Sequence, residues 1–526
     1  MKYKEVEPGF NVSPQLPPDR LAELASRGFR SVICNRPDGE EPGQPSAETM
    51  RAAAEAAGLQ FTAIPVVGGA IGDADVARMA AALAELPRPI LAYCRSGARS
   101  AKLWELAQDK NPPAQYDVVI VGGGSAGIAS AASLLRRRPG LSIAIIEPSD
   151  VHYYQPGWTL VGAGVFTPEV TRRATATVIP DGCTWIRESA ASFEPESNAV
   201  RLADGTRVKY RILVAAPGLK LDWDAIPGLS ETLGKNGVTS NYRYDLAPYT
   251  YKLACELSSG RALFTQPPMP IKCAGAPQKA MYLSCDLWRR AGKLGNIDVQ
   301  FHTAGAVLFG VAAYVPALND YVQRYGITLN LESRLTAVDG NARVATFEHK
   351  GPDGAVAHTE QPFDMLHAVP PQLAPDFIRS SALAGASGFV EVDDATLQHA
   401  RYPNVFGLGD ACSAPNAKTA AAARKQAPVV AENALAVLDG APPIAVYDGY
   451  GSCPLTVERG RIVLAEFGYG GKLLPSFPKW LIDGTRPSRA AWFLKDRILP
   501  ALYWRGMLKG REWLAKPAHK PLVPSD

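Results

Sequence analysis

Several features that place a chain in a familiar class are absent from this sequence. It has 8 cysteines among 526 residues, and none of them shows a CxxC or zinc-finger spacing, which excludes a disulfide scaffold and predicts no metal site. No stretch reaches the roughly 20 apolar residues of a transmembrane helix, and the first residues begin no apolar signal segment. We therefore expect a cytoplasmic protein with reduced thiols, in which an oxidised cysteine is catalytic rather than structural.

The sequence also has little excess charge, because 55 lysines and arginines nearly balance 51 aspartates and glutamates. A formal net charge of +4 gives no reason to expect a nucleic-acid partner, and 47% hydrophobic residues exclude a disordered chain. The charge is unevenly placed, however. Residues 486–526 carry nine lysines or arginines against three acidic residues, so this end of the sequence is basic.

A glycine-rich turn stands between a predicted strand and a predicted helix. The strand 118–121 leads into the turn, the helix 128–138 follows it, and the next strand, 141–146, is followed by an acidic residue. This is the dinucleotide-binding fingerprint in its required context: one glycine forms the tight turn, one lets the backbone approach the pyrophosphate, and one allows close helix packing. The residues predicted to bind the cofactor here are Gly122, Gly124, Ser125, Ala126, Gly127 and Glu147.

Two later segments indicate that the dinucleotide is FAD. Residues 404–410 resemble the late motif of flavoproteins with two dinucleotide-binding domains, whose aspartate binds the ribityl chain, and residues 213–218 resemble their middle motif, with Pro217 where threonine is usual. A helix predicted from residue 418 to about residue 435 has an N-terminus that favours negative charge on the flavin ring. These segments add Gly218, Gly409, Asp410, Lys418 and Thr419 to the predicted cofactor site.

The second glycine fingerprint of enzymes that take electrons from NAD(P)H is absent. After a predicted strand at 261–265, residues 266–279 contain prolines and Cys273 in place of phosphate-binding glycines. A nicotinamide cofactor is therefore not expected. The reductant has to be another compound, and a cysteine occupies the position at which it would act.

Residues 116 to about 515 closely resemble the sulfide:quinone oxidoreductase family, particularly its mitochondrial form. The resemblance is carried by residues 152–164, 271–279, 449–455 and 462–467. It implies FAD-mediated oxidation of hydrogen sulfide, delivery of electrons to a membrane quinone, and transfer of the sulfane sulfur to an acceptor such as sulfite or a small thiol. It also implies that Gln155, within the first of these stretches, lies at the cofactor.

The resemblance assigns the family's two redox cysteines to Cys273 and Cys412. It implies a disulfide, or a bridge with an additional sulfur, that sulfide opens to leave a persulfide on Cys412 and a flavin-facing thiolate on Cys273. Cys412 follows Gly409-Asp410-Ala411, one residue later than in the mitochondrial pattern. Lys272 and a helix predicted at 278–290 are expected to lower the pKa of Cys273. Ordinary core positions are predicted for Cys34, Cys183, Cys255, Cys285 and Cys453.

The basic end of the sequence predicts an interfacial membrane anchor. Two short amphipathic helices, one at 490–499 and one beginning at Pro500, carry apolar residues between basic ones, and the proline is expected to separate them. A terminal helical pair packed on the core is the alternative. We expect peripheral, monotopic attachment to the cytoplasmic face of the inner membrane, with quinone entering from the bilayer. The apolar face of the second helix is Tyr503, Trp504, Met507 and Leu508, and the quinone pocket is predicted at Phe467, Tyr503 and Trp504.

A further candidate nucleophile lies near the beginning of the sequence. Cys94 follows a predicted strand and precedes a helix, and its spacing to Gly97 and Arg99 matches the rhodanese pattern C-x-x-G-x-R. A ring of backbone N–H groups of this length suits a persulfide sulfur. Residues 35–39 and the order of elements, however, resemble phosphatase-like domains that occur fused to β-lactamase-fold hydrolases. We favour sulfur transfer by Cys94 and Arg99, and keep phosphatase activity, with Asp38 as the acid, as the alternative.

The predicted fold class is α/β: a flavoprotein with two dinucleotide-binding domains, built as tandem Rossmann domains like the FAD-dependent disulfide reductases, preceded by a small domain like the dual-specificity phosphatases. Two other functions stay open, a flavocytochrome-type sulfide dehydrogenase subunit and an FAD-binding sulfide or redox sensor that signals through the front domain. The predicted boundaries are 1–107 for the front domain, 108–115 for a linker, 116–235 and 363–440 for the two parts of the FAD domain, 236–362 for the second Rossmann-like domain, and 441–526 for the quinone and membrane interface.

Overall fold

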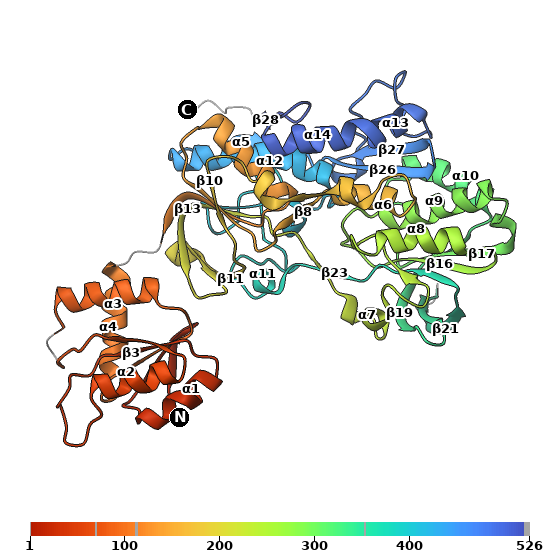
Figure 1. Cartoon of the computed structure of the whole chain (residues 1–526). Helices are drawn as coiled ribbons and strands as arrows, with labels where there is room; N and C mark the ends of the chain where they lie inside the picture. Colours follow the sequence, from red (N-terminus) through yellow and green to blue (C-terminus); the bar gives the residue numbers. More distant parts are fainter. Residues whose placement is uncertain (1, 69–70, 111–113, 352–353, 520–526) are drawn as a thin grey trace. The chain divides into compact units, whose positions relative to one another are not determined.

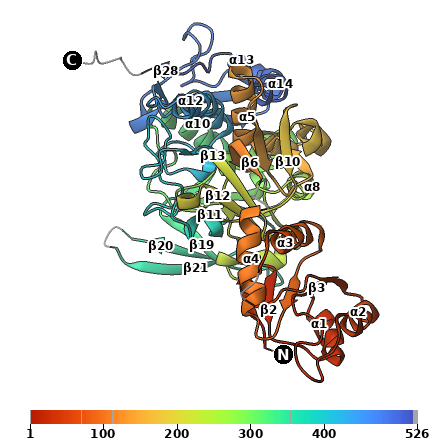
Figure 2. The same cartoon turned by 90° about the vertical axis from the view of Figure 1, so that its left-hand side faces the viewer.

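The computed structural model describes residues 2–68, 71–110, 114–351 and 354–519, and the chain divides into two compact units (Figures 1 and 2). The smaller unit comprises the chain up to Tyr116 together with Glu188–Tyr210, and the larger unit comprises the remainder. The predicted linker includes residues 111–113, which lie outside the described residues. On either side of them, helix α4 (Ala98–Lys110) extends beyond residue 107 and strand β6 (Gln115–Val121) begins at residue 115.

The smaller unit is built on a five-stranded sheet in the order β1-β2-β5-β3-β4. Its strands run parallel except for β1, which pairs antiparallel with β2 at one edge. Ile90 and Ala92 join one apolar cluster while Leu91 and Tyr93 join another, because successive side chains of a strand point to opposite faces of the sheet. The elements are β1 (Lys4–Glu7), β2 (Phe10–Ser13), α1 (Leu21–Ser26), β3 (Ser31–Cys34), α2 (Ala47–Ala56), β4 (Gln60–Ala63), α3 (Asp73–Glu85) and β5 (Ile90–Tyr93).

A seven-stranded sheet in the order β10-β7-β6-β13-β12-β11, with β24 paired to β13, carries the first dinucleotide motif. Parallel pairing of β10, β7 and β6, and of β13 and β24, brings strand ends together at one edge. The Gly122 turn joins β6 to α5 (Ser125–Arg137), and the long helix α12 (Ala420–Leu438) packs along α5. The other strands are β7 (Ile143–Ile146), β10 (Cys183–Ile186), β11 (Ala190–Glu194), β12 (Ala199–Leu202), β13 (Arg207–Ala215) and β24 (Val405–Gly407).

A second parallel sheet, in the order β15-β22-β16-β17-β18, lies in the larger unit. Cys273 stands in the segment between the end of β16 and the start of α9 (Ala276–Arg290), at the edge where α/β proteins place their ligands. The parallel strands of these two sheets, the first of which also contains the antiparallel strands β11 and β12, confirm the predicted α/β class with two Rossmann-like domains. The strands are β15 (Val238–Thr239), β16 (Gly260–Gln266), β17 (Ile297–Thr303), β18 (Thr328–Asn330) and β22 (Met365–His367), and a separate antiparallel sheet contains β19 (Ser333–Asp339), β20 (Val344–Lys350) and β21 (Val356–Pro362).

The C-terminal part adds a hairpin and a helical stretch. Strands β26 (Gly451–Glu458) and β27 (Arg461–Phe467) form the hairpin, and α13 (Arg489–Phe493), a π-helical turn (Leu494–Ile498) and α14 (Leu499–Arg505) follow. The prediction that Pro500 separates two helices is wrong. Pro500 stands in the first turn of α14, a position that tolerates proline, and the three helical pieces succeed one another without a loop.

The apolar residues of this C-terminal part divide into a buried and an exposed group. The face predicted to enter a membrane is buried in the protein, because it packs on the aromatic residues of the first dinucleotide-binding region. Across the described ranges, no helix is long and apolar enough to cross a membrane. The buried residues are Tyr503, Trp504, Met507 and Leu508, and the exposed ones include Trp480, Leu481, Phe493 and Ile498.

Candidate active sites

The glycines of the first turn are placed where no side chain fits. A Cβ on Gly122, whose φ is +103°, would lie 2.4 Å from the carbonyl oxygen of Ala216, and a Cβ on Gly127 would lie 1.9 Å from that of Gly122. Gly124, by contrast, faces open space. The turn therefore packs tightly against the strand on its inner side and offers its backbone on the outer side, a cradle that fits a pyrophosphate at the N-terminus of α5.

Glu147 and an unpredicted histidine fix the shape of this turn. The Glu147 carboxylate accepts hydrogen bonds from the N–H groups of Gly123 and Ser149, each at 2.8 Å. His152 Nδ1 lies 3.2 Å from the Gly123 carbonyl oxygen and Nε2 lies 2.6 Å from the Tyr503 hydroxyl. Burial lowers the pKa of His152 to about 4, so the neutral ring donates from Nδ1 and accepts the hydroxyl proton at Nε2. Helix α14 is thereby tied to the fingerprint.

The late motif lies beside the same turn. A Cβ on Gly409 would lie 2.9 Å from the Ala126 Cβ, and the Gly409 N–H donates to the Gln426 side chain at 2.8 Å. The Gln426 Nε2 atom is buried and makes no hydrogen bond within the described residues. Burial raises the pKa of Asp410, partly offset by the Lys418 and Lys272 ammonium groups. An unpaired amide and a carboxylate between two lysines are polar groups that a flavin can satisfy, so this site fits a flavin dinucleotide.

Other residues predicted for the cofactor surround these two motifs. Thr419 caps α12 by accepting the Ala422 N–H at 3.1 Å, and Lys418 is buried with its Nζ 2.8 Å from the Cys412 carbonyl oxygen. Gln155 accepts a hydrogen bond from Lys272 Nζ at 2.7 Å. Gly218 follows β13 and has a φ of +76°. It lies two residues after Ala216, whose carbonyl oxygen leaves no room for a Cβ at Gly122.

Cys273 is held in an unusual backbone conformation next to the flavin motif. Its φ is +47°, in the left-handed region that residues with side chains rarely adopt. Its N–H donates to the Lys418 carbonyl at 2.7 Å, and the Tyr242 hydroxyl donates to its carbonyl oxygen at 3.3 Å. Such a conformation persists only where the surroundings impose it, and it marks functional sites more often than ordinary core positions.

The Cys273 sulfur lies in a cluster of one thiol and two lysines. Its Sγ is 3.9 Å from Cys453 Sγ and 3.1 Å from Lys279 Nζ. The hydrogen bond from Cys453 and the Lys279 ammonium hold the pKa of Cys273 well below its usual range, whereas the same contact raises the pKa of Cys453. Burial and the nearby Lys279 charge lower the pKa of Lys495 to about 7. These contacts therefore favour the thiolate form at Cys273 and the thiol form at Cys453.

The structure does not place Cys412 in this cluster. Its Sγ lies 3.4 Å from the Gly409 carbonyl oxygen, and burial raises the pKa of its thiol. The pairing of Cys273 with Cys412 therefore stays a prediction. Lys279, rather than the predicted Lys272, contacts the thiolate. Sequence reasoning missed Cys453, Lys279 and Lys495, although the first two lie in stretches that carried the family resemblance.

Replacing Lys279 by methionine is expected to shift the alkylation of Cys273 to higher pH. The Lys279 charge favours the thiolate, so its removal raises the pKa of Cys273 and lowers the fraction of thiolate below pH 8. The rate of iodoacetamide labelling at Cys273, followed by peptide mass spectrometry from pH 5 to 9, measures this. Lys279→Arg keeps the charge and should retain the wild-type profile; identical profiles for Lys279→Met and wild type would contradict the assignment.

The smaller unit contains the second cysteine site. Cys94 is fully buried at the end of β5, and the Gly97 N–H donates to its sulfur at 3.1 Å. Burial raises the pKa of this thiol, but the N–H groups of Ser100 and Ser96 outweigh burial and lower it overall. Gly97, with φ +89°, closes the loop against Ser13, where a Cβ would come within 3.3 Å of backbone atoms. A loop of N–H groups around a thiolate at the start of α4 is an anion-binding arrangement.

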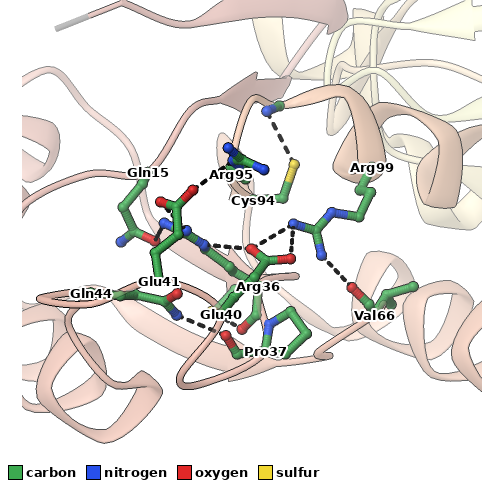
Figure 3. Close-up of polar contacts among 12 residues, drawn as sticks. Gln15, Arg36, Pro37, Glu40, Glu41, Gln44, Val66, Cys94, Arg95 and Arg99 are labelled. Atoms are coloured by element: carbon green, nitrogen blue, oxygen red, sulfur yellow. Dashed lines mark hydrogen bonds and ion pairs between the residues drawn. The ribbon is translucent and has the colours of Figure 1, made fainter. Parts of the chain in front are cut away.

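Two glutamates pair with the arginines around this loop (Figure 3). Arg99 donates to both Glu40 carboxylate oxygens, at 2.7 and 2.8 Å, and to the Val66 carbonyl at 2.6 Å. The buried Arg36 pairs with Glu40 at 2.7 Å and with Glu41 at 2.6 Å, while Arg95 pairs with Glu41 at 2.8 Å. Each guanidinium near the thiolate is therefore neutralised by a carboxylate of the protein itself.

The remaining predicted residues take different places. Asp38 accepts the Ala47 N–H at 2.7 Å and so caps the first turn of α2. Phe467 packs on Phe309 with ring centroids 5.9 Å apart, in a different aromatic group from Tyr503 and Trp504. Among the cysteines predicted for the core, Cys34, Cys285 and Cys453 are buried and Cys183 is half-buried, whereas Cys255 is exposed.

Two family profiles match successive parts of the chain. Residues 2–111 match the phosphatase-like domain of beta-lactamase hydrolase-like proteins, and residues 116–252 match the pyridine nucleotide-disulphide oxidoreductases. The first match agrees with the order of elements around Cys94, and the second with the dinucleotide motif at Gly122.

Longer similarities cover most of the larger unit. The mitochondrial sulfide:quinone oxidoreductase of Dictyostelium discoideum is 42% identical over 402 residues, which are 76% of this chain and 87% of that protein. The mitochondrial sulfide:quinone oxidoreductase of Mus musculus is 40% identical over 395 residues, covering 75% of this chain and 87% of that protein. The crystal structure of the sulfide:quinone oxidoreductase from Aquifex aeolicus shares the fold with a TM-score of 0.62 at 20% identity, over 76% of this chain and 93% of that one.

Proposed function

The chain belongs to the sulfide:quinone oxidoreductase family, and from this we propose that it oxidises hydrogen sulfide at Cys273 and passes two electrons through FAD to a membrane quinone. The observation that supports this most directly is the Cys273 thiolate, 3.1 Å from Lys279 Nζ and bonded through its backbone to Lys418 of the flavin motif. Steady-state reduction of a soluble ubiquinone analogue by sulfide tests it. Slow single-turnover bleaching of the flavin without quinone reduction would favour the sensor function instead.

The residues of the chain divide this reaction between them. HS⁻ attacks the partner sulfur of a disulfide that contains Cys273; the S–S bond breaks, the partner keeps the new sulfur as a persulfide, and the electron pair stays on Cys273. Lys279 stabilises that thiolate, and bound FAD supplies the two-electron acceptor. Sulfite or a small thiol then removes the outer sulfur of the persulfide. The family pattern gives Cys412 as the partner, and the identity of the partner is tested below.

NADH is expected to leave the flavin oxidised. The segment after β16 carries Cys273 and Lys272 where a nicotinamide enzyme has phosphate-binding glycines, so no cradle receives the dinucleotide. The purified protein should be yellow with one FAD per chain, bleach with sulfide, and keep its absorbance under anaerobic NADH. Rapid bleaching by micromolar NADH would contradict the prediction, and dithionite serves as the control for complete reduction.

For the smaller unit we propose sulfur transfer at Cys94. The loop presents N–H groups to a thiolate, which stabilises the low-pKa sulfur needed to accept a sulfane sulfur. Phosphatase activity is less well supported, because an arginine binds phosphate through the same N–H groups that it offers a carboxylate, and Arg99, Arg95 and Arg36 are paired with Glu40 and Glu41 (Figure 3). Asp38, the candidate acid of a phosphatase, is bound to the start of α2 instead.

For the larger unit we propose peripheral attachment to the cytoplasmic face of the inner membrane through a C-terminal apolar patch. Trp480 is 84% exposed and Phe493 is 58% exposed, whereas aromatic residues of this size are normally largely buried. Arg486 and Arg497 lie in the same part of the sequence and are exposed, where they pair with Asp483 and Asp496, and basic residues in a segment with tryptophan and phenylalanine suit an anionic lipid surface. A peripheral position lets a quinone reach the flavin from the bilayer.

Replacing Trp480 and Phe493 together by serine is expected to weaken binding to vesicles of phosphatidylglycerol and phosphatidylcholine by at least about 10-fold, because two inserted aromatic side chains are lost. Sedimentation with vesicles measures the binding. Bleaching of the flavin by sulfide should not change. The control is Val356→Ser, since Val356 is 57% exposed on β21, at the far end of this unit from α13 in both views (Figures 1 and 2). Unchanged sedimentation of the double variant would contradict the patch as the anchor.

A further inference from the structure

A second thiol lies next to the redox cysteine, and it comes from the C-terminal hairpin. Cys453 is the third residue of β26, and its Sγ lies 3.9 Å from Cys273 Sγ although the two residues are 180 positions apart. A disulfide has an S–S length of about 2.05 Å, so rotation about the side-chain bonds of two neighbouring cysteines can close the remaining gap. Cys453 is buried and Cys273 is half-buried.

The backbone on the Cys273 side leaves room for this approach. A Cβ on Gly275 would lie 2.6 Å from Cys453 Sγ and 2.3 Å from Leu455 Cδ2, so any larger residue would push β26 away. Cys273 itself has φ +47° and is fixed by hydrogen bonds to Lys418 and Tyr242. The strained cysteine and the missing side chain two residues later together direct the two sulfurs toward each other.

The charges around the pair suit thiol–disulfide chemistry. Lys279, on α9, contacts the Cys273 sulfur, and Lys495, from the π-helical turn, is buried and interacts with both sulfurs. The buried Lys279 ammonium group, beside a second buried lysine, is costly unless an anion compensates it. The thiolate released when a disulfide opens supplies that anion. Cys412 has a different environment, with its sulfur on the Gly409 carbonyl and a raised pKa.

We infer that Cys453 is the disulfide partner of Cys273 in the oxidised enzyme and carries the persulfide after sulfide attack. The inference rests on the proposed function and changes one assignment within it, because Cys453 takes the role that the family pattern gives to Cys412. The one-residue displacement of Cys412 from that pattern is consistent with such an exchange.

The reaction at this cysteine pair has three steps. HS⁻ bonds to Cys453 Sγ, the Cys453–Cys273 bond breaks, and its electron pair becomes the Cys273 thiolate, leaving Cys453–S–SH. Sulfite bonds to the outer sulfur and leaves as thiosulfate, while Cys453 keeps a thiol proton. The Cys273 thiolate and the Cys453 thiol then re-form the disulfide, releasing one proton and two electrons, for which bound FAD would be the acceptor and the quinone the final oxidant.

Disulfide mapping of the wild-type holoenzyme tests this directly. The three cysteines fall on three different tryptic peptides, 273–279, 402–418 and 426–459, so the linkages can be told apart. The full-length protein is oxidised with quinone, free thiols are blocked with N-ethylmaleimide, and the digest is read without reduction. We expect peptide 273–279 linked to 426–459, with Cys412 alkylated. A link between 273–279 and 402–418, or alkylation of both Cys273 and Cys453, overturns the inference.

Two variants test the inference through the rate of sulfide-driven bleaching of the flavin. Cys453→Ser should slow sulfide-driven bleaching by at least about 100-fold. The control is Cys285→Ala, since Cys285 is a fully buried cysteine on α9, the helix that also carries Lys279. Full activity of Cys453→Ser overturns the inference. Quinone reduction by the wild type under sulfide is measured alongside, and its absence would overturn the proposed function instead.

Discussion

Serine in place of Cys273 is expected to abolish reduction of the flavin by sulfide, with a fall in rate of at least about 1,000-fold. The expectation follows from the position of the sulfur. It is the thiolate beside the Lys418 backbone and the Lys279 ammonium group, and a hydroxyl in its place is neither ionised at pH 7 nor able to form a disulfide. The loss should be the same whether Cys412 or Cys453 is the partner, because both assignments require Cys273.

Anaerobic stopped-flow absorbance of the flavin measures this rate. The variant should bind FAD normally, since the cofactor residues are those of the glycine turn and the late motif, and dithionite should still bleach it. Cys285→Ala tests whether loss of any cysteine in this domain has the same effect. Sulfide-driven bleaching of Cys273→Ser at a rate near that of wild type would exclude the proposed mechanism.

Cys94→Ser is expected to remove thiosulfate:cyanide sulfurtransferase activity, again by about 1,000-fold, while quinone reduction by sulfide continues with sulfite as acceptor. The reason is that the N–H groups of the Cys94 loop stabilise an anionic sulfur, which serine does not provide. When labelled sulfide is supplied, wild-type protein should carry label on a fragment ending near Gln115, and the variant should not.

The matched control is Cys34→Ala, which removes another buried cysteine of the same unit. Hydrolysis of an aryl phosphate by the wild type, abolished in Cys94→Ser, together with an unlabelled fragment would assign the smaller unit to the phosphatase alternative. A Glu40→Gln variant adds a further comparison. It frees Arg99 from a carboxylate, so a phosphatase should gain activity, whereas sulfur transfer does not require that arginine to be unpaired.

The sequence by itself determined the local units of this protein. The strand, the glycine turn and the helix around Gly122 follow from residue spacing, because a turn that must avoid the Ala216 carbonyl accepts only glycine whatever surrounds the domain. The same holds for the absent second fingerprint after β16 and for the cysteine loop between β5 and α4. In each case the residues that carry the chemistry are neighbours in sequence, so their spacing already fixes their geometry.

The tertiary structure decided which distant side chains meet. Cys453 reaches Cys273 only because β26 packs against α9, and Lys495 joins them from a helical stretch that the sequence predicted as a membrane anchor. The sequence predicts that the aromatic face of α14 belongs to a membrane anchor, but periodicity shows only that one face is apolar, not whether protein or lipid covers it. Contacts between side chains of different elements depend on how the helices and sheets pack. The spacing of residues along one element does not determine which other element packs against it.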